Sequence, residues 1–242
     1  MRFDIITIFP HIFDSYFNES IIKRAKEKKM VDIRIHNLRD YSRDKHHKVD
    51  DKPYGGGAGM VMQVEPIVRA VEAIVKRQVT RDKGQVKIVL FSAKGKPFNQ
   101  KMAYDWSKKK KNIIFITGRY EGIDERVITV LRVLGFTIQE VSIGPYITTD
   151  GDVAAMVVVS ALTRLTPNVI NWNSLEDESF LRKVLSREVR SGQLEYPHYT
   201  RPEVFVWPSA KRKGKGKEFR VPKVLLSGDH KKIKQWRGRH WK

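Results

Sequence analysis

Residues 112–122 read NIIFITGRYEG, an apolar run rich in β-branched side chains that ends in a glycine-containing loop. Two further stretches repeat this pattern, KIVLFSAKG at 87–95 and FTIQEVSIGPY at 136–146. Each run has the length and composition of a buried strand, and helix-compatible segments separate the runs. Strands that alternate with helices are typical of an α/β fold with a mostly parallel sheet that helices cover on both faces.

The same alternation continues outward in both directions. We predict further strands at 3–9 and 31–36, and helices at 12–29, 65–77 and 152–165. After Pro167 the sequence becomes polar and charged. We therefore expect an α/β domain at 1–167, a linker at 168–195 that orders on contact with a partner, and a short basic domain at 196–242.

Composition excludes several kinds of chemistry. The 242 residues include no cysteine, which rules out disulfides, thiolate metal sites and the covalent cysteine mechanism of pyrimidine C5 methyltransferases. The seven histidines form no H-E-x-x-H pattern, so a zinc hydrolase is not expected. The longest apolar stretch, 153–162, is shorter than the roughly 20 residues of a membrane span, and no signal-peptide pattern follows Met1. We expect a cytoplasmic protein without a membrane segment.

The net charge of +20 is unevenly placed along the chain. Residues 208–242 hold 13 Lys/Arg and 2 Asp/Glu, a net charge of +11, which leaves +9 for the first 207 residues. Aromatic side chains lie among or near these cations: Tyr196, Tyr199, Trp207, Trp236 and Trp241. Cations neutralise phosphates and flat rings stack on unpaired bases, so this end predicts nucleic-acid binding. The alternative is a solvated basic face that keeps the protein soluble.

Four glycine-containing loops stand out, at 53–59, 92–95, 117–122 and 142–146. The last three follow predicted strands, and open α/β sheets bind ligands at the carboxyl ends of their strands. Each loop alone is typical of an ordinary turn, whereas three in one sheet indicate a shared pocket. None matches the P-loop or the dinucleotide-binding fingerprint.

Arg164 ends the predicted helix 152–165, and Asp177 and Glu178 follow in the expected linker. In one interpretation Arg164 is a cation favoured at a helix C-terminus, and the two acids are solvated. In the other, a substrate loses a proton to a carboxylate while the arginine stabilises the developing negative charge. The residues alone leave both interpretations open.

Several strings together resemble one known family. DDKPYGGGAGM (50–60), TGRYEGIDER (117–126), SIG (142–144) and YPHYTRPE (196–203) are similar, in order and spacing, to the tRNA (guanine-N1) methyltransferases of the TrmD type. VPKVLLSGDH (221–230) and IKQWR (233–237) extend the resemblance over nearly the whole chain. The resemblance implies a SPOUT α/β domain with a trefoil knot, a smaller helical domain that binds tRNA, and a homodimer with its active site at the subunit interface.

The resemblance also implies that S-adenosylmethionine binds in the knot loops and methylates N1 of guanosine 37, next to the tRNA anticodon. By motif match, its pocket is expected to contain Leu90, Phe91, Ser92, Gly118, Tyr120, Ile143, Gly144, Tyr146 and Gly151. Glu121 corresponds to a family acid associated with Mg²⁺. The family base is an Asp directly before Ser-Phe, and an arginine that ends the preceding helix stabilises charge on O6. Arg164 matches this arginine, Glu178 stands at the position of the base, and Asp177 is its substitute.

Besides Glu178, the chain departs from the family in a loop string and in a basic insertion. The family string SIGDYVLTGGE is replaced by SIGPYITTDGD, with Pro145, Thr148 and Asp150 as the main changes. An added carboxylate at position 150 is expected either to clash with S-adenosylmethionine or to hydrogen-bond to it. A basic insertion at 211–217 is expected to supply tRNA contacts that further helices make in relatives. The alternatives to the main prediction are a SPOUT RNA methyltransferase with a shifted target and a catalytically silent RNA-binding homologue.

Overall fold

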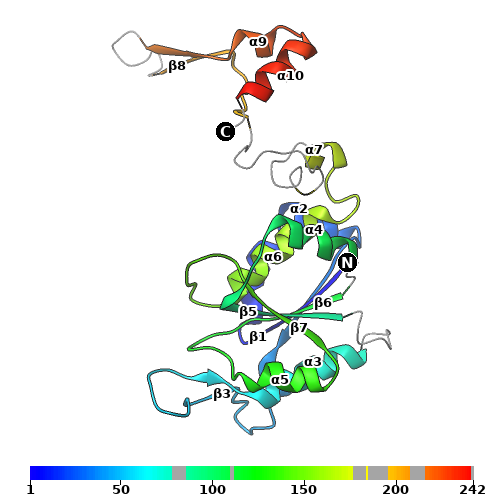
Figure 1. Cartoon of the computed structure of the whole chain (residues 1–242), viewed down its shortest axis with the longest axis vertical. Coiled ribbons are helices and arrows are strands. Elements are labelled where there is room, and N and C mark those ends of the chain that lie inside the picture. The colour runs from blue at the N-terminus through cyan, green and yellow to red at the C-terminus, as the bar shows by residue number, and fades with distance from the viewer. Residues whose placement is uncertain (78–85, 110–111, 177–183, 185–195, 208–215, 241–242) are drawn as a thin grey trace. The chain divides into compact units, whose positions relative to one another are not determined.

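The chain forms two compact units, Met1–Leu175 and Glu176–Lys242. The computed structural model describes residues 1–77, 86–109, 112–176, 184, 196–207 and 216–240 (Figure 1). The boundary between the units falls inside the segment 168–195, where we expected a linker. Each unit is described by itself below.

A five-stranded sheet forms the centre of the first unit, with the order β2-β1-β6-β5-β7. Its strands are β1 (Arg2–Thr7), β2 (Asp32–Asn37), β5 (Val86–Pro97), β6 (Asn112–Ile116) and β7 (Thr137–Ser142). All neighbouring strands are parallel, which confirms the predicted mostly parallel α/β sheet. The continuous apolar sequences of β1, β5 and β6 have a simple cause, since these three strands lie inside the sheet order and helices cover both faces.

Helices cover the two faces of this sheet (Figure 1). One face carries α3 (Val64–Arg77) and α5 (Arg126–Val133), and the other carries α2 (Ser20–Glu27), α4 (Gln100–Lys109) and α6 (Asp152–Leu165). The helix predicted at 152–165 is confirmed with the same bounds. A core cluster joins α3 and α5 to the sheet through side chains such as Ile67, Ile74, Ile88, Ile114 and Leu131.

The single helix predicted over 12–29 is wrong. The structure has three short helices there, η1 (Pro10–Phe13), α1 (Asp14–Phe17) and α2. Glu19 is extended and Ser20 has a φ of 50°, so the helical backbone is interrupted between α1 and α2. The polar, glycine-rich residues 37–59 contain η2 (Leu38–Tyr41) and β3 (Asp50–Asp51), and β3 pairs antiparallel with β4 (Val61–Met62).

Residues 92–95 were expected to form a loop after a strand, but they lie within β5. Phe91 and Lys96 both pair with Val141 of β7, so the residues between them form a bulge in the ladder. Gly95 sits against the neighbouring strand, and a Cβ at this position would lie 2.5 Å from the backbone nitrogen of Val141. A glycine is therefore required where the bulge returns to the sheet.

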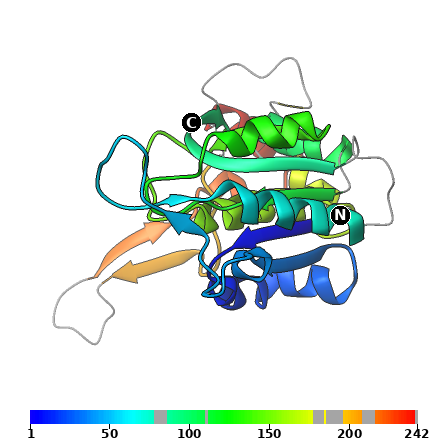
Figure 2. The same cartoon turned by 90° about the horizontal axis from the view of Figure 1, so that it is seen from below.

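From residue 196 onward, the described part of the second unit contains a hairpin and two short helices. The antiparallel strands β8 (Val204–Trp207) and β9 (Lys217–Arg220) form the hairpin, shown in orange in Figure 2. The helices are α9 (Lys223–Leu226) and α10 (His230–Arg239), and the Asp229 side chain accepts hydrogen bonds from the first backbone N–H groups of α10. The resemblance implied a small helical domain, and it did not predict this hairpin. Among all described helices, none is both long and apolar enough to cross a membrane.

Candidate functional site

A pocket of about 580 Å³ lies at the carboxyl ends of β6 and β7, beside the bulge of β5. Eight of the nine residues predicted to bind the cofactor line it. They are Leu90, Phe91 and Ser92 from β5, Gly118 and Tyr120 from the loop after β6, and Ile143, Tyr146 and Gly151 from the loop after β7. The structure therefore brings three loops that are distant in sequence into one site.

Gly144, the ninth predicted residue, does not line the pocket. A Cβ at Gly144 would overlap the ring of Tyr146. The Tyr146 hydroxyl donates a hydrogen bond to the Ile143 carbonyl oxygen at 3.2 Å, which folds the ring back over this glycine. Gly144 thus shapes the loop rather than the pocket wall.

Close backbone contacts hold the loops together. The Gly151 N–H donates to the Gly118 carbonyl oxygen at 2.8 Å, and a Cβ on Gly151 would lie 2.8 Å from the Gly118 nitrogen. Thr117 donates through its N–H and its hydroxyl to the Ile6 carbonyl oxygen, at 3.1 and 2.9 Å. These bonds attach the loop after β6 to β1 on one side and to the loop after β7 on the other.

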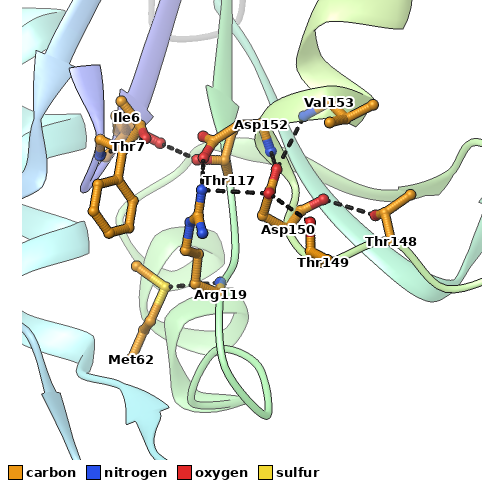
Figure 3. Close-up of polar contacts among 11 residues, drawn as sticks. Ile6, Thr7, Met62, Thr117, Arg119, Thr148, Thr149, Asp150, Asp152 and Val153 are labelled. Atoms are coloured by element: carbon orange, nitrogen blue, oxygen red, sulfur yellow. Dashed lines mark hydrogen bonds and ion pairs between the residues drawn. The ribbon is translucent and has the colours of Figure 1, made fainter. Parts of the chain in front are cut away.

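A largely buried ion-pair network lies in the wall of the pocket, and Figure 3 shows its contacts. The Nη2 atom of Arg119 lies 3.1 Å from Oδ2 of Asp152 and 3.3 Å from Oδ2 of Asp150. The guanidinium also stacks over the ring of Phe9, 4.3 Å from its centroid. Both carboxylates are almost completely buried, and Arg119 is the cation that lies beside them. The sequence interpretation singled out neither Arg119 nor Asp152.

Asp150 also caps the N-terminus of α6. Its Oδ1 accepts hydrogen bonds from the backbone N–H groups of Asp152 at 2.9 Å and Val153 at 3.2 Å, at the start of α6 (Figure 3). Acceptors at this position satisfy helix N–H groups that have no partner within the helix. The carboxylate that departs from the family string is thus directed at α6 and at Arg119, although its residue also lines the pocket.

The pocket lining is acidic although the chain as a whole is basic. Five acids (Glu121, Asp124, Glu125, Glu140 and Asp150) and two bases (Lys94 and Arg119) line it, a difference of −3 in a chain of net charge +20. Such a lining favours a positively charged ligand.

Most of these acids already have a cation beside them. Lys94 Nζ lies 2.7 Å from Glu125 Oε2 and 3.8 Å from Glu140 Oε2, and the hydrogen bond to Glu125 raises the pKa of Lys94. The hydrogen bond from Arg126 holds the pKa of Asp124 below its ordinary value. The Oε2 atom of Glu140 is buried and accepts no hydrogen bond from the described residues.

Glu121 differs from the other acids, because its carboxylate has no hydrogen bond or ion pair with the described part of the chain. The loop 53–59 packs against it at Gly59, which has a φ of +79° and where a Cβ would overlap the Glu121 side chain. The residues that the structure describes contain no group of three acidic or histidine side chains able to hold a metal ion. Glu121 alone does not form a Mg²⁺ site.

The structure does not bring Arg164 to the pocket within the first unit. Ala154, in the first turn of α6, lines the pocket, whereas Arg164 lies in the last turn. Ten residues at 1.5 Å each separate Ala154 from Arg164 by about 15 Å along the helix axis. Asp177 and Glu178, the candidate bases, lie outside the described residues.

Arg164 shares one face of α6 with exposed apolar side chains. The spacing of Val153, Val157, Ser160 and Arg164 places them on one side of the helix, which we call the α6 face. The side chains of Val153 and Val157 are 41% and 44% exposed. Tyr16 of α1 donates a hydrogen bond to Ser160 Oγ at 2.9 Å, and it is exposed together with Phe9 and Ile12. An apolar surface therefore runs along α6 and ends at a cation.

Comparison with known proteins gives consistent matches over the whole chain. Residues 1–242 match the family described as tRNA (Guanine-1)-methyltransferase TrmD. A tRNA (guanine-N(1)-)-methyltransferase of Carboxydothermus hydrogenoformans is 47% identical over 98% of this chain and 81% of the relative. Proteins of the same name from Clostridioides difficile and Dictyoglomus turgidum are 44% and 43% identical, again over 98% of this chain, and over 90% and 83% of the relatives.

Proposed function

The chain belongs to the tRNA (guanine-1)-methyltransferase family, and we propose that its loop pocket holds S-adenosylmethionine next to N1 of guanosine 37 in a tRNA. Family membership makes the protein a tRNA (guanine-N1)-methyltransferase, and that activity requires a methyl donor. One observation supports the location of the donor most strongly: eight residues selected by motif converge on a single acidic pocket.

The charge of the donor suits this lining. S-adenosylmethionine carries a permanently positive sulfonium, and the lining has three more acids than bases. We propose that the carboxylate of Glu121, which has no partner among the described residues, balances that charge. Leu90, Ile128 and Ala154 supply apolar wall for the adenine ring. Because no described cluster forms a Mg²⁺ site, the metal has no step in this scheme.

The reaction needs a base because guanine N1 carries a proton at neutral pH. We propose that the Glu178 carboxylate accepts this proton, with Asp177 as its substitute, while N1 attacks the methyl carbon. The N1–C bond forms as the S–C bond breaks, and neutral S-adenosylhomocysteine leaves. The guanidinium of Arg164 stabilises the negative charge that develops on O6. The resemblance to the family supports the assignments of both Glu178 and Arg164.

A homodimer brings Arg164 to a pocket. We propose that the α6 faces of two subunits pack against each other in antiparallel orientation about a twofold axis. The last turn of one α6 then meets the first turn of the other, so Arg164 of each subunit serves the pocket of its partner. The exposed Val153 and Val157 supply the apolar contact. This arrangement accounts for the separation of about 15 Å along α6 within one subunit.

Two further assignments follow from family membership. We propose that the loop after β7 takes part in a SPOUT-type trefoil knot, an assignment supported by the close passage of Gly151 along Gly118. We also propose that residues 196–242 hold the tRNA, because 13 of the chain's 47 Lys/Arg residues lie in 208–242.

The proposed function is tested by incubating the full chain with transcribed tRNA and S-adenosylmethionine and mapping the methylated base. We expect N1-methylguanosine at position 37, and a transcript with adenosine at position 37 is the control. Methylation at another base would show a shifted target and would contradict the proposal.

A further inference from the structure

One face of the β8–β9 hairpin is aromatic and basic. In the antiparallel register Phe205 pairs with Phe219 and Trp207 pairs with Lys217. Side chains alternate between the two faces of a strand, so these four residues share one side, which we call the hairpin face. The opposite side carries Val204, Val206, Glu218 and Arg220.

The three rings of the hairpin face lie close to one another and are open to solvent. The Phe205 ring centroid lies 6.2 Å from that of Trp207 and 6.3 Å from that of Phe219. The interplanar angle between Phe205 and Trp207 is 17°. Phe205, Trp207 and Phe219 are 49%, 58% and 49% exposed, and together they line a shallow hollow. A cluster of three large exposed aromatic side chains marks a binding surface more often than an ordinary surface.

The charges around these rings are positive. Lys217 Nζ lies 5.6 Å from the Phe219 ring centroid, on the same face. On the opposite side Arg220 forms an ion pair with Glu218 at 2.6 Å, so that side carries a compensated charge. The sequence that joins the two strands, 208–216, contains four Lys/Arg residues and no acid. A ligand for the hairpin face should therefore offer both flat apolar surfaces and negative charge.

We propose that the hairpin face stacks unpaired bases of the tRNA while Lys217 on the same face neutralises a phosphate. This inference rests on the proposed function and adds to it the kind of nucleotide that the second unit holds. Bases in a duplex already stack on their neighbours and do not offer their faces, so the hairpin face selects single-stranded positions. A second copy of the chain is a poorer match in charge than RNA, because its net charge is also +20.

The test measures RNA binding by the full chain with fluorescence anisotropy. The probes are transcribed tRNA, a single-stranded oligonucleotide and a blunt duplex of the same sequence. The variants are Phe205→Ala and Trp207→Ala, with Trp207→Phe as the control that keeps a ring and Val206→Thr as the control on the opposite side. Loss of stacking should weaken single-strand and tRNA binding about fivefold to about a hundredfold for each alanine variant. Both controls should bind within about twofold of the wild type, and duplex binding should be weak throughout.

A kinetic readout separates this proposal from the proposed function. The alanine variants should raise the KM for tRNA while kcat at saturating tRNA and the affinity for S-adenosylmethionine stay at wild-type values. Wild-type tRNA affinity in both alanine variants, or an equal loss in Trp207→Phe, would overturn the stacking role and leave the methyltransferase assignment intact. Dissociation of an oligomer with unchanged tRNA affinity would assign the face to a protein interface and also overturn it. A wild-type chain that fails to methylate tRNA would instead contradict the proposed function.

Discussion

Arg119 Nη2 lies 3.1 Å from Asp152 Oδ2, and the Asp152 side chain is fully buried. This ion pair joins the loop after β6 to the first turn of α6, and both of these elements border the pocket. Asp152 Oδ1 and Arg119 Nε are buried and have no hydrogen bond among the described residues. Few other contacts would therefore compensate for either charge if its partner were removed. The shape of the pocket therefore depends on a charge pair that touches no proposed reacting atom.

Removing one member of this pair should destabilise the first unit. Asp152→Asn leaves the Arg119 charge with only Asp150 beside it, and breaking a buried pair costs about 3–5 kcal/mol. We expect a lower urea midpoint and weaker binding of S-adenosylmethionine by calorimetry. Asp150→Asn is the matched control, because asparagine caps a helix as well as aspartate and Asp152 remains to pair with Arg119. An Asp152→Asn variant as stable as Asp150→Asn would refute the role of the buried pair.

Gly151 should tolerate no larger residue. Gly151→Ala places a Cβ 2.8 Å from the Gly118 nitrogen, so the two loops must separate. We expect the affinity for S-adenosylmethionine to fall at least about tenfold. A loss of roughly 1.4 kcal/mol in binding free energy is enough for a tenfold weaker affinity. Gly238→Ala, in α10 with no atom within 4 Å of the new Cβ, is the control and should bind as the wild type does. Equal affinities in the two variants would disprove the close loop contact.

Asp4 should make the stability of the first unit depend on pH in the acid range. Burial alone would raise the pKa of Asp4, but hydrogen bonds from His36 at 2.7 Å and from Arg2 at 2.8 and 2.9 Å bring its pKa below the ordinary value of 3.8. A carboxyl group whose pKa is lower in the folded than in the unfolded state stabilises the folded state at pH values above its unfolded-state pKa. This contribution is lost as the pH falls through the folded-state pKa.

The measurement for Asp4 is the free energy of unfolding in urea between pH 6 and pH 2. The wild type should lose stability on acidification below about pH 4 more steeply than Asp4→Asn, which has no proton to take up there. Asp105→Asn removes an exposed acid that pairs with Lys101, and it should keep the wild-type slope closely. Parallel curves for the wild type and Asp4→Asn would show that Asp4 contributes nothing to the acid transition.

The identity of the base can be decided by two amide substitutions. We expect Glu178→Gln to lower kcat by about 10²- to 10⁴-fold, the usual effect of losing a general base. Asp177→Asn should keep most of the activity, since Asp177 is only the substitute. Single-turnover methyl transfer with saturating tRNA measures the chemical step directly. Full activity in Glu178→Gln would show that the proton goes elsewhere.

The sheet and the pocket were largely predictable, whereas the network beneath the pocket was not. Buried strands such as 112–116 are apolar throughout, and the loops that follow parallel strands must meet at one edge of the sheet. Arg119 and Asp152 are 33 residues apart, and only the packing of Gly151 on Gly118 brings them together. No periodicity in the sequence reports a contact of that kind.

Local patterns also misled where the backbone departs from regular geometry. Apolar side chains at Phe13, Phe17 and Ile21 have helical spacing, yet the positive φ of Ser20 interrupts the helix. The segment 92–95 contains a glycine that is typical of a turn, but this glycine admits the backbone of Val141 within a continuing strand. The hairpin strands are four residues each, too short for an alternating pattern to stand out beside the basic sequence between them.

The central claim is that each active site combines the pocket of one subunit with Arg164 of the other, and mixed dimers test it most directly. Arg164→Ala and Gly151→Ala chains are co-expressed with different tags. N1-methylguanosine formation is measured on transcribed tRNA at an S-adenosylmethionine concentration too low to occupy the Gly151→Ala pocket, so that each variant alone has little activity. Random mixing makes about half of the dimers mixed with one intact site each, so about a quarter of the wild-type activity should return. If the mixture, shown by its two tags to contain mixed dimers, stays as inactive as the separate variants, Arg164 serves its own subunit's pocket and the shared site is contradicted.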